Sequence, residues 1–289
     1  MKKRIGLRLQ LPLVLLLLVQ AGCIKKTIAI PLDQRLLPAK TAARGELFQA
    51  LEEKSKQIQT LKGTVSLDLS RGGAKSGVLD EYRQTKGYVF VDRPAHIRVQ
   101  VQLPIVLSTV AIMVSDGIQY RISIPIKNQY AVRDIDEPLS SKSSVNDLRP
   151  QMFLDGLFVD VRPYAGKPNV RATFEEQVQG VHSYYVFSFI DISNFETELL
   201  EKIWIDRTDL QVSRKQVFGK DGRVETDVDY QNYLNEDGIP YPEIIVIHRP
   251  VEDYTVKMTF QQTTLNETLD SNIFNLPRPE GSELVQLAK

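Results

Sequence analysis

The sequence predicts a mainly β fold with two helices, in which a mostly antiparallel sheet curls into a barrel or half-barrel. Short segments that alternate polar and apolar residues recur between residues 65 and 262, and turn signals such as Asp116-Gly117 and Asp237-Gly238 separate them. Two other segments show helical periodicity instead. With 42% apolar residues, a chain of 289 residues can bury a core.

Two helices are expected, one before the sheet and one inside it. Apolar residues recur at helical spacing with charged residues between them, which predicts a helix over 45–62 that ends at Gly63. The apolar positions are Leu47, Phe48, Leu51, Ile58 and Leu61. A polar stretch interrupts the strands after residue 136, and an apolar helical pattern follows it over 145–158. We expect both helices to cover one face of the sheet.

The strands are predicted from alternation and from the turns that bound them. Val65, Leu67 and Leu69 alternate with polar residues directly after the first helix. The further expected strands are 79–84, 86–91, 96–102, 109–115, 118–124, 129–134, 170–178, 183–191, 198–206, 211–219, 223–233, 242–249 and 254–262.

The N-terminus predicts an exported lipoprotein. A basic start precedes an apolar run over 11–19, which is too short to span a bilayer and is typical of a secretory signal over 1–22. Ala21 and Gly22 precede Cys23, the single cysteine of the chain, and this arrangement resembles the lipobox that directs lipid attachment to the cysteine. The place three residues before the cysteine holds Gln20 where a leucine is usual. An ordinary signal with a chance cysteine is the alternative.

The expected mature protein starts at Cys23, with a tether over 23–44 and a single domain over 45–289. Without the signal it has 32 basic and 36 acidic residues, a net charge of −4, which gives no footprint for binding nucleic acid. Lipidation supplies more than one acyl chain, as stable anchoring requires. Ile24 follows the cysteine and is not Asp, which resembles the sorting signal of outer-membrane lipoproteins and predicts a periplasm-facing place in the cell envelope.

Five phrases together resemble one known group of proteins. They are LKGTVSLDL, GYVFVDRPAHIRVQV, IMVSDGIQYRISIPIKNQYAVRD, the stretch from LEKIWIDRTDLQVSRKQVFGKDGRVETD to IIVIHRP, and IFNLPRPEGSELVQL. The series covers about residues 45–287 and resembles the lipoprotein-localisation proteins of the LolA/LolB-like superfamily, with a lipid-anchored member as the nearer match. The resemblance implies an unclosed antiparallel β-barrel, a helical lid and an apolar cavity for acyl chains.

No pattern in the sequence predicts catalysis, a metal or a cofactor. His96, His182 and His248 are far apart and form no metal-binding spacing, and there is no cysteine cluster. The Gly-Lys-Asp-Gly sequence at 219–222 is predicted as a hairpin turn, since it lacks the strand–loop–helix context of a phosphate loop. We therefore expect no enzyme.

An apolar loop and two sets of apolar side chains are the candidate sites. Pro104 cannot donate to a strand ladder, so Leu103, Pro104, Ile105, Val106 and Leu107 are predicted as a loop that either contacts a membrane or folds onto the core. Helix residues Met152, Phe153, Leu157 and Phe158 either pack as ordinary core or line an acyl pocket. Strand residues that could line the same pocket are Val65, Leu67, Leu69, Val99, Val101, Ile112 and Val114. Alternation does not say which face of the sheet is concave.

Two hypotheses of function follow. In the first, the protein binds acyl chains of lipoproteins or lipids in its barrel, receives them from a periplasmic carrier and helps to insert them into the outer membrane. Each buried methylene contributes about 0.8 kcal/mol, so a carrier must offer an apolar cavity that matches the bilayer. In the second, the same fold is an envelope sensor or scaffold that binds protein partners, and a filled barrel would favour it.

Overall fold

The computed structural model describes residues 31, 33, 35–72, 79–103, 108–135, 149–193 and 195–285. Residues Leu37–Lys289 form one compact unit, and Met1–Leu36 form another. Main-chain hydrogen bonds from Leu37 N to Val181 O (2.8 Å) and from Lys40 N to Arg207 O (2.7 Å) attach the start of the compact unit to its sheet. The segment predicted as a tether is thus bonded to the sheet from Leu37 onward.

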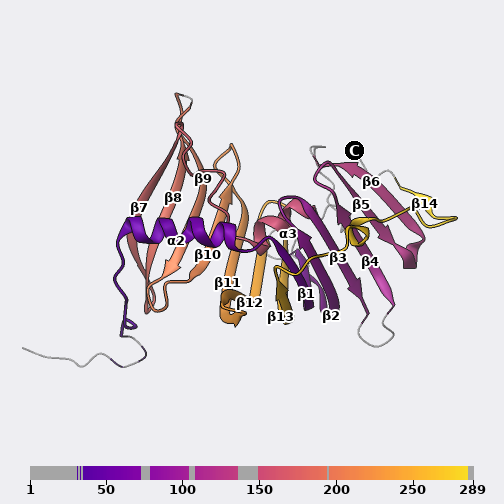
Figure 1. The fold of residues 1–289 in the computed structure, drawn as a ribbon, viewed down its shortest axis with the longest axis horizontal. Helices are drawn as coiled ribbons and strands as arrows, with labels where there is room; N and C mark the ends of the chain where they lie inside the picture. Colours follow the sequence, from indigo (N-terminus) through magenta and orange to yellow (C-terminus); the bar gives the residue numbers. More distant parts are fainter. Residues whose placement is uncertain are drawn as a thin grey trace, which may run out of the picture. The chain divides into compact units, whose positions relative to one another are not determined.

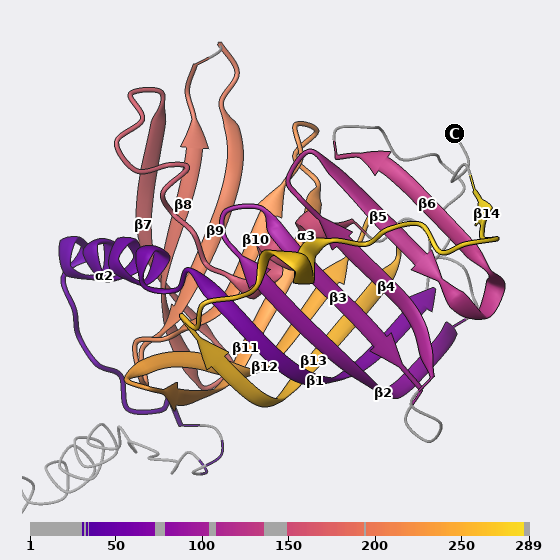
Figure 2. The same ribbon diagram turned by 45° about the vertical axis from the view of Figure 1, so that its right-hand side comes forward.

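The described part of the compact unit is one curved, unclosed sheet with helices against one face (Figures 1 and 2). Its fourteen strands follow the order β14-β6-β5-β4-β3-β2-β1-β13-β12-β11-β10-β9-β8-β7, so that β1 meets β13 in the middle and β7 and β14 are the two edges. All neighbours are antiparallel except β14 and β6. The predicted fold class, an open antiparallel half-barrel with a helical lid, is confirmed.

The elements have the following bounds. The helices are α2 (Arg44–Gln57), η3 (Pro125–Lys127), α3 (Pro150–Leu157) and η5 (Ser271–Phe274). The strands are β1 (Thr60–Gly72), β2 (Leu79–Asp92), β3 (His96–Gln102), β4 (Thr109–Ser115), β5 (Gln119–Ile124), β6 (Gln129–Asp134), β7 (Val170–Gln179), β8 (His182–Asp191), β9 (Glu198–Asp206), β10 (Val212–Phe218), β11 (Val224–Glu236), β12 (Ile239–Arg249), β13 (Tyr254–Leu265) and β14 (Glu283–Leu284).

The first helix is shorter than the prediction of 45–62. It ends at Gln57, because the chain from Thr60 onward pairs with both β2 and β13. Leu61 is fully buried as a strand residue. Gly63 has a packing role and does not stop the helix, since a Cβ there would lie 2.7 Å from the Phe260 ring.

Two further differences concern the sheet and the second helix. The segments predicted as strands 79–84 and 86–91 form the single strand β2, whose register against β1 shifts between Leu67 and Leu69. Helix α3 begins at Pro150, a residue suited to the first turn because its missing N–H has no partner there anyway. Residues 145–148 of the predicted helix lie outside the described part of the chain.

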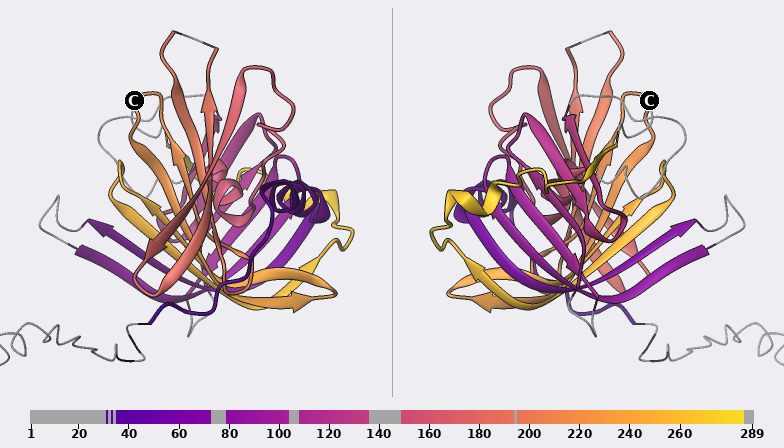
Figure 3. Two further views of the ribbon diagram at one scale, coloured as in Figure 1. Left: turned by 90° about the vertical axis from the view of Figure 1, so that its left-hand side faces the viewer. Right: turned by 90° about the vertical axis from the view of Figure 1, so that its right-hand side faces the viewer.

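The two helices lie against the concave face of the sheet (Figure 3). Helix α2 packs on the β7–β10 half, where the Phe48 and Phe187 ring centroids are 5.9 Å apart and the Arg44 guanidinium donates to Ala172 O on edge strand β7 (2.7 Å). Helix α3 packs on β12, and Gly156 allows this close approach because a Cβ there would collide with the Ile247 side chain. The concave face therefore forms the core.

The C-terminal segment covers part of the convex face. It runs across β3 and β4 to β14 (Figure 2), where the Arg98 guanidinium donates to Ile273 O (3.0 Å) and the Tyr130 hydroxyl donates to Leu276 O (2.8 Å). A second, smaller apolar cluster forms beneath it, around Phe274 and Leu276. One half of the sheet is thus covered on both faces.

Candidate functional site

The interior of the half-barrel is one continuous apolar cluster that joins both helices to the sheet. Most of the side chains predicted from the sequence as pocket candidates belong to it. Buried in this cluster are Val65, Leu67, Val99, Met152, Phe153, Leu157 and Phe158, while Leu69 and Val101 are partly buried against it. The structure therefore brings the helix and strand candidates together on the concave face.

Ile112 and Val114 lie on the other face of the sheet. Val99 is opposite Met113 in the β3–β4 register, so the interior residue of β4 is Met113, and its two neighbours point outward. Val114 is buried in the cluster beneath the C-terminal segment, and Ile112 packs against that cluster. These two candidates are therefore not part of the interior.

A cleft opens into the interior between the two helices and strands β10–β12. Its cavity volume is about 50 Å³. Helix α2 contributes Leu51, Lys54 and Gln57, and the end of α3 contributes Leu157 with the following Phe158 and Val159. The remaining lining residues are Ile58, Arg93, Val212, Tyr230, Tyr233, Ile239, Pro240, Tyr241 and Pro242. Its lining of mostly apolar side chains with a few polar groups is typical of a small-ligand site, but its volume is much smaller than that of a usual ligand pocket.

The polar groups of the cleft differ in whether they have a hydrogen-bond partner. The Tyr233 hydroxyl donates to Val212 O (2.8 Å), and the Tyr241 hydroxyl donates to Leu157 O (3.3 Å). Lys54 Nζ donates to Gln211 Oε1 (2.7 Å). Burial lowers the pKa of Lys54, and the charge of Asp209 partly offsets this shift. The Tyr230 hydroxyl is buried and has no hydrogen-bond partner among the described residues.

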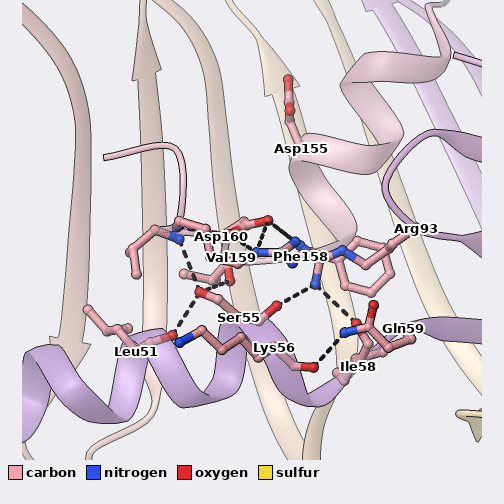
Figure 4. Close-up of polar contacts among 12 residues, drawn as sticks. Leu51, Ser55, Lys56, Ile58, Gln59, Arg93, Asp155, Phe158, Val159 and Asp160 are labelled. Atoms are coloured by element: carbon pink, nitrogen blue, oxygen red, sulfur yellow. Dashed lines mark hydrogen bonds and ion pairs between the residues drawn. The ribbon is translucent and has the colours of Figure 1, made fainter. Parts of the chain in front are cut away.

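Arg93 joins three separate segments beside the cleft (Figure 4). Its guanidinium, in the turn after β2, donates to Ser55 O (2.7 Å) and Ile58 O (3.0 Å) at the end of α2, and it pairs with Asp160 after α3. Only 6% of the Arg93 side chain is exposed. Burial lowers the pKa of Arg93, and the Asp160 charge opposes that shift. Arg93 thus holds the ends of the two helices together.

Ser55 makes a second link between the same segments (Figure 4). Its buried hydroxyl donates to Leu51 O within α2 (2.8 Å) and accepts from Val161 N beyond α3 (3.0 Å). A polar residue inside a helix interior is expected to bond locally to the preceding turn, as this one does. The link fixes the segment after α3 against α2.

A buried polar group lies beneath the end of α3. Lys215 Nζ donates to Phe158 O (2.9 Å) and to Asp155 O, the carbonyls left open at the helix C-terminus. Glu201 is buried nearby, and the Tyr164 hydroxyl donates to its Oε2 (3.3 Å). Burial raises the pKa of Glu201 to about 7, although the charge of Lys215 acts in the opposite direction.

The histidines form no common site. His182 Nδ1 lies 2.7 Å from Asp206 Oδ2, and His248 Nε2 lies 3.4 Å from Asp229 Oδ2. The His96 ring is tilted against the Phe274 ring, with the centroids 5.5 Å apart. Among the described residues, no group of three or more His, Cys, Asp or Glu side chains could hold a metal ion. In the same part of the chain, no helix has the length and apolar character needed to cross a membrane.

Two sites predicted from the sequence fall largely outside the described residues. Cys23 is one. Of the predicted membrane-contact loop, Pro104, Ile105, Val106 and Leu107 are also outside, and only Leu103 is described. Leu103 is 38% exposed, and its N–H donates to Ser108 O (3.0 Å), so the loop joins β3 to β4 at one end of the hairpin.

Several residues that build the cleft were not predicted as site residues. Arg93 lies between the predicted strands 86–91 and 96–102, and Tyr230 lies within the predicted strand 223–233. A weak signal was present in the spacing of Tyr230, Tyr233 and Tyr241 over two neighbouring strands. The three tyrosines meet at the cleft only because the helices pack over them, and a local sequence pattern does not predict that packing.

Comparisons with known proteins support the fold. No protein-family model and no curated protein sequence matches the chain. A solved DUF1329 family protein from Desulfovibrio piger has a TM-score of 0.52 and 13% identity, over 80% of this chain and 95% of that one. At this identity the likeness shows a shared fold alone.

Two other solved structures also resemble the chain. One is a LolA superfamily protein from Nitrosomonas europaea, with a TM-score of 0.48 and 12% identity over 82% of this chain and 99% of that one. The other is a putative outer membrane lipoprotein-sorting protein domain from Vibrio parahaemolyticus, with a TM-score of 0.47 and 11% identity over 80% of this chain and 95% of that one.

Proposed function

We propose that this chain is a lipid-anchored envelope protein that binds acyl chains of lipoproteins or lipids and helps to insert them into the outer membrane. The observation that carries the proposal is the cleft between α2, α3 and strands β10–β12, which leads into a continuous apolar interior. Transfer of apolar surface out of water is the driving force, at about 0.8 kcal/mol for each buried methylene. The proposed activity requires no covalent chemistry and no cofactor.

The test uses a lipopeptide with two palmitoyl chains and the chain carrying Cys23→Ser, which has no acyl chain of its own. We expect saturable binding of the lipopeptide and its transfer to acceptor vesicles, and we expect no binding of the same peptide without acyl chains. Equal binding of the acylated and unacylated peptides would contradict the proposal. That result would favour a partner-binding scaffold of the same fold.

A scaffold or sensor remains the second candidate, and the density of the interior favours it. Side chains from both helices and from most strands already fill the concave face, and many of them are completely buried. A ligand would enter only where the helices part. In this second function, the partner would be a protein that binds the outside of the fold.

Lipidation of Cys23 is predicted to control membrane attachment. Cys23→Ser should leave the protein unlipidated, so that it fractionates as a soluble protein or as an uncleaved precursor. The measurement is membrane fractionation followed by mass determination of the N-terminus. A Cys23→Ser protein that is still processed and still remains with the membrane would show that the lipobox interpretation is wrong.

The β3–β4 loop is predicted to enter the bilayer interface. Full burial of one large aliphatic side chain is worth roughly 1.5–3 kcal/mol, and the tether keeps the membrane at high effective concentration. Changing Leu103, Ile105 and Leu107 to Glu in the Cys23→Ser background should abolish liposome binding and leave the melting temperature unchanged. If the loop belongs to the core, the same variant will unfold, because buried carboxylates without partners are costly.

A further inference from the structure

Tyr230 carries a buried hydroxyl that the described protein does not satisfy. The residue lies on the concave face of β11, opposite Ile245 of β12, and only 5% of it is exposed. Its hydroxyl oxygen is sealed from solvent and has no hydrogen-bond partner among the described residues. A buried polar group without a partner is unfavourable, so its retention calls for an explanation.

The neighbouring tyrosines of the cleft differ from Tyr230, because their hydroxyls have partners within the protein. Tyr233 and Tyr241 line the same cleft, and both hydroxyls are bonded to main-chain carbonyls of the protein. These two hydroxyls therefore stabilise the fold. At position 230 a phenylalanine would fill the same space without an unsatisfied oxygen, so the hydroxyl is available for a ligand.

The surroundings of Tyr230 define the chemistry of that ligand. The cleft walls include the apolar side chains of Ile58, Leu157 and Val212. Burial raises the pKa of Tyr230 well above its usual value, and the neighbouring Tyr233 adds to the shift, so the hydroxyl keeps its proton and can donate it. The low polarity around the hydroxyl disfavours a charged partner. It favours a neutral acceptor that is attached to an apolar chain.

We infer that the Tyr230 hydroxyl donates a hydrogen bond to the neutral carbonyl of an ester-linked or amide-linked acyl chain that lies in the cleft. The inference rests on the proposed acyl-binding function and adds a specificity residue to it. The acyl chain occupies the apolar part of the cleft, and the carbonyl reaches Tyr230. Because the hydroxyl is sealed in the ligand-free protein, the inference requires that the Arg93 and Ser55 contacts between the helix ends open when the ligand enters.

The test compares two lipids that differ in the carbonyl alone. They are dipalmitoyl phosphatidylglycerol and its dihexadecyl ether counterpart, which has the same headgroup and chain length. The full chain with Cys23→Ser is equilibrated with vesicles of each lipid, and the lipid that stays bound is quantified after separation. One neutral hydrogen bond corresponds to about a threefold to tenfold preference for the ester.

Tyr230→Phe should remove this preference and bind both lipids as the unsubstituted protein binds the ether. Tyr233→Phe is the matched control and should keep the preference, because its hydroxyl serves Val212 O. The inference is overturned if Tyr230→Phe still prefers the ester, or if the unsubstituted protein binds both lipids equally. The proposed function would survive either result. If neither lipid binds, the inference and the proposed function both fail.

A stability measurement checks the premise independently. The melting temperature of ligand-free Tyr230→Phe should equal or exceed that of the unsubstituted protein, since no bond is lost. Tyr233→Phe should melt at a lower temperature because it loses the bond to Val212 O. A clear decrease for Tyr230→Phe would mean that its hydroxyl has a partner in the free protein, and it would overturn the inference.

Discussion

Arg93→Ala should lower the free energy of unfolding by about 3 kcal/mol, because it removes a buried cation while the groups that the cation binds stay buried. The substitution frees the Ser55 and Ile58 carbonyls at the end of α2, and it also removes one of the two cations that pair with Asp160. Stacking over the Phe158 ring, 4.8 Å from the guanidinium, is lost as well. Urea unfolding followed by fluorescence measures the change.

Arg162→Ala is the matched control, since Arg162 pairs with the same carboxylate. Burial would raise the pKa of Asp160, but hydrogen bonds from Arg162 and the charge of Arg93 hold it below its usual value. Arg162 is 37% exposed and bonds no carbonyl of α2, so its removal should cost less than about 1 kcal/mol. Equal losses for the two variants would contradict the role of Arg93 as the link between the helices.

Glu201→Gln should stabilise the protein above pH 7 and have little effect near pH 4.5. The folded protein holds the Glu201 proton up to about pH 7, whereas the unfolded chain releases it near the usual value of 4.5. The folded state therefore binds more protons between these values, and stability falls as pH rises through this window. Glutamine does not titrate, so the variant avoids this loss of stability, which amounts to roughly 3 kcal/mol at pH 8.

The measurement is the free energy of unfolding of both proteins at pH 4 and pH 8. The comparison at pH 4 is the internal control, because the Glu201 carboxyl is mostly protonated in both the folded and the unfolded protein there. The Tyr164 hydroxyl can still donate to the amide oxygen of glutamine. A variant that is less stable than the unsubstituted protein at pH 8 would mean that charged Glu201 is favoured by its environment, in conflict with the burial described above.

Alternation in the sequence predicted the strands well, but it could not assign their faces. Val65, Leu67 and Val99 lie in the interior, while Val114, from an equally regular segment, is buried on the convex face. The difference arises because the C-terminal segment covers that face with Phe274. A strand that is covered on both sides gives no pattern from which its inner face can be read.

The cleft was less predictable than the fold, because its residues meet only through long-range contacts. Arg93 is a turn residue in the sequence and becomes buried only when α2 and the segment after α3 close over it. Lys215 looks like an exposed strand residue, yet it reaches the open carbonyls at the end of α3. Helix α3 was predicted, but its position over the sheet depends on Gly156, which allows a close approach to Ile247.

Mass spectrometry of lipids that copurify with the Cys23→Ser protein tests the central claim most directly. The account predicts one acyl-chain lipid bound in near-equimolar amount after extraction of the purified protein, and its loss when competing lipid vesicles are added. A protein that carries no lipid, and that takes up none when incubated with dipalmitoyl lipids, would contradict acyl binding in the half-barrel.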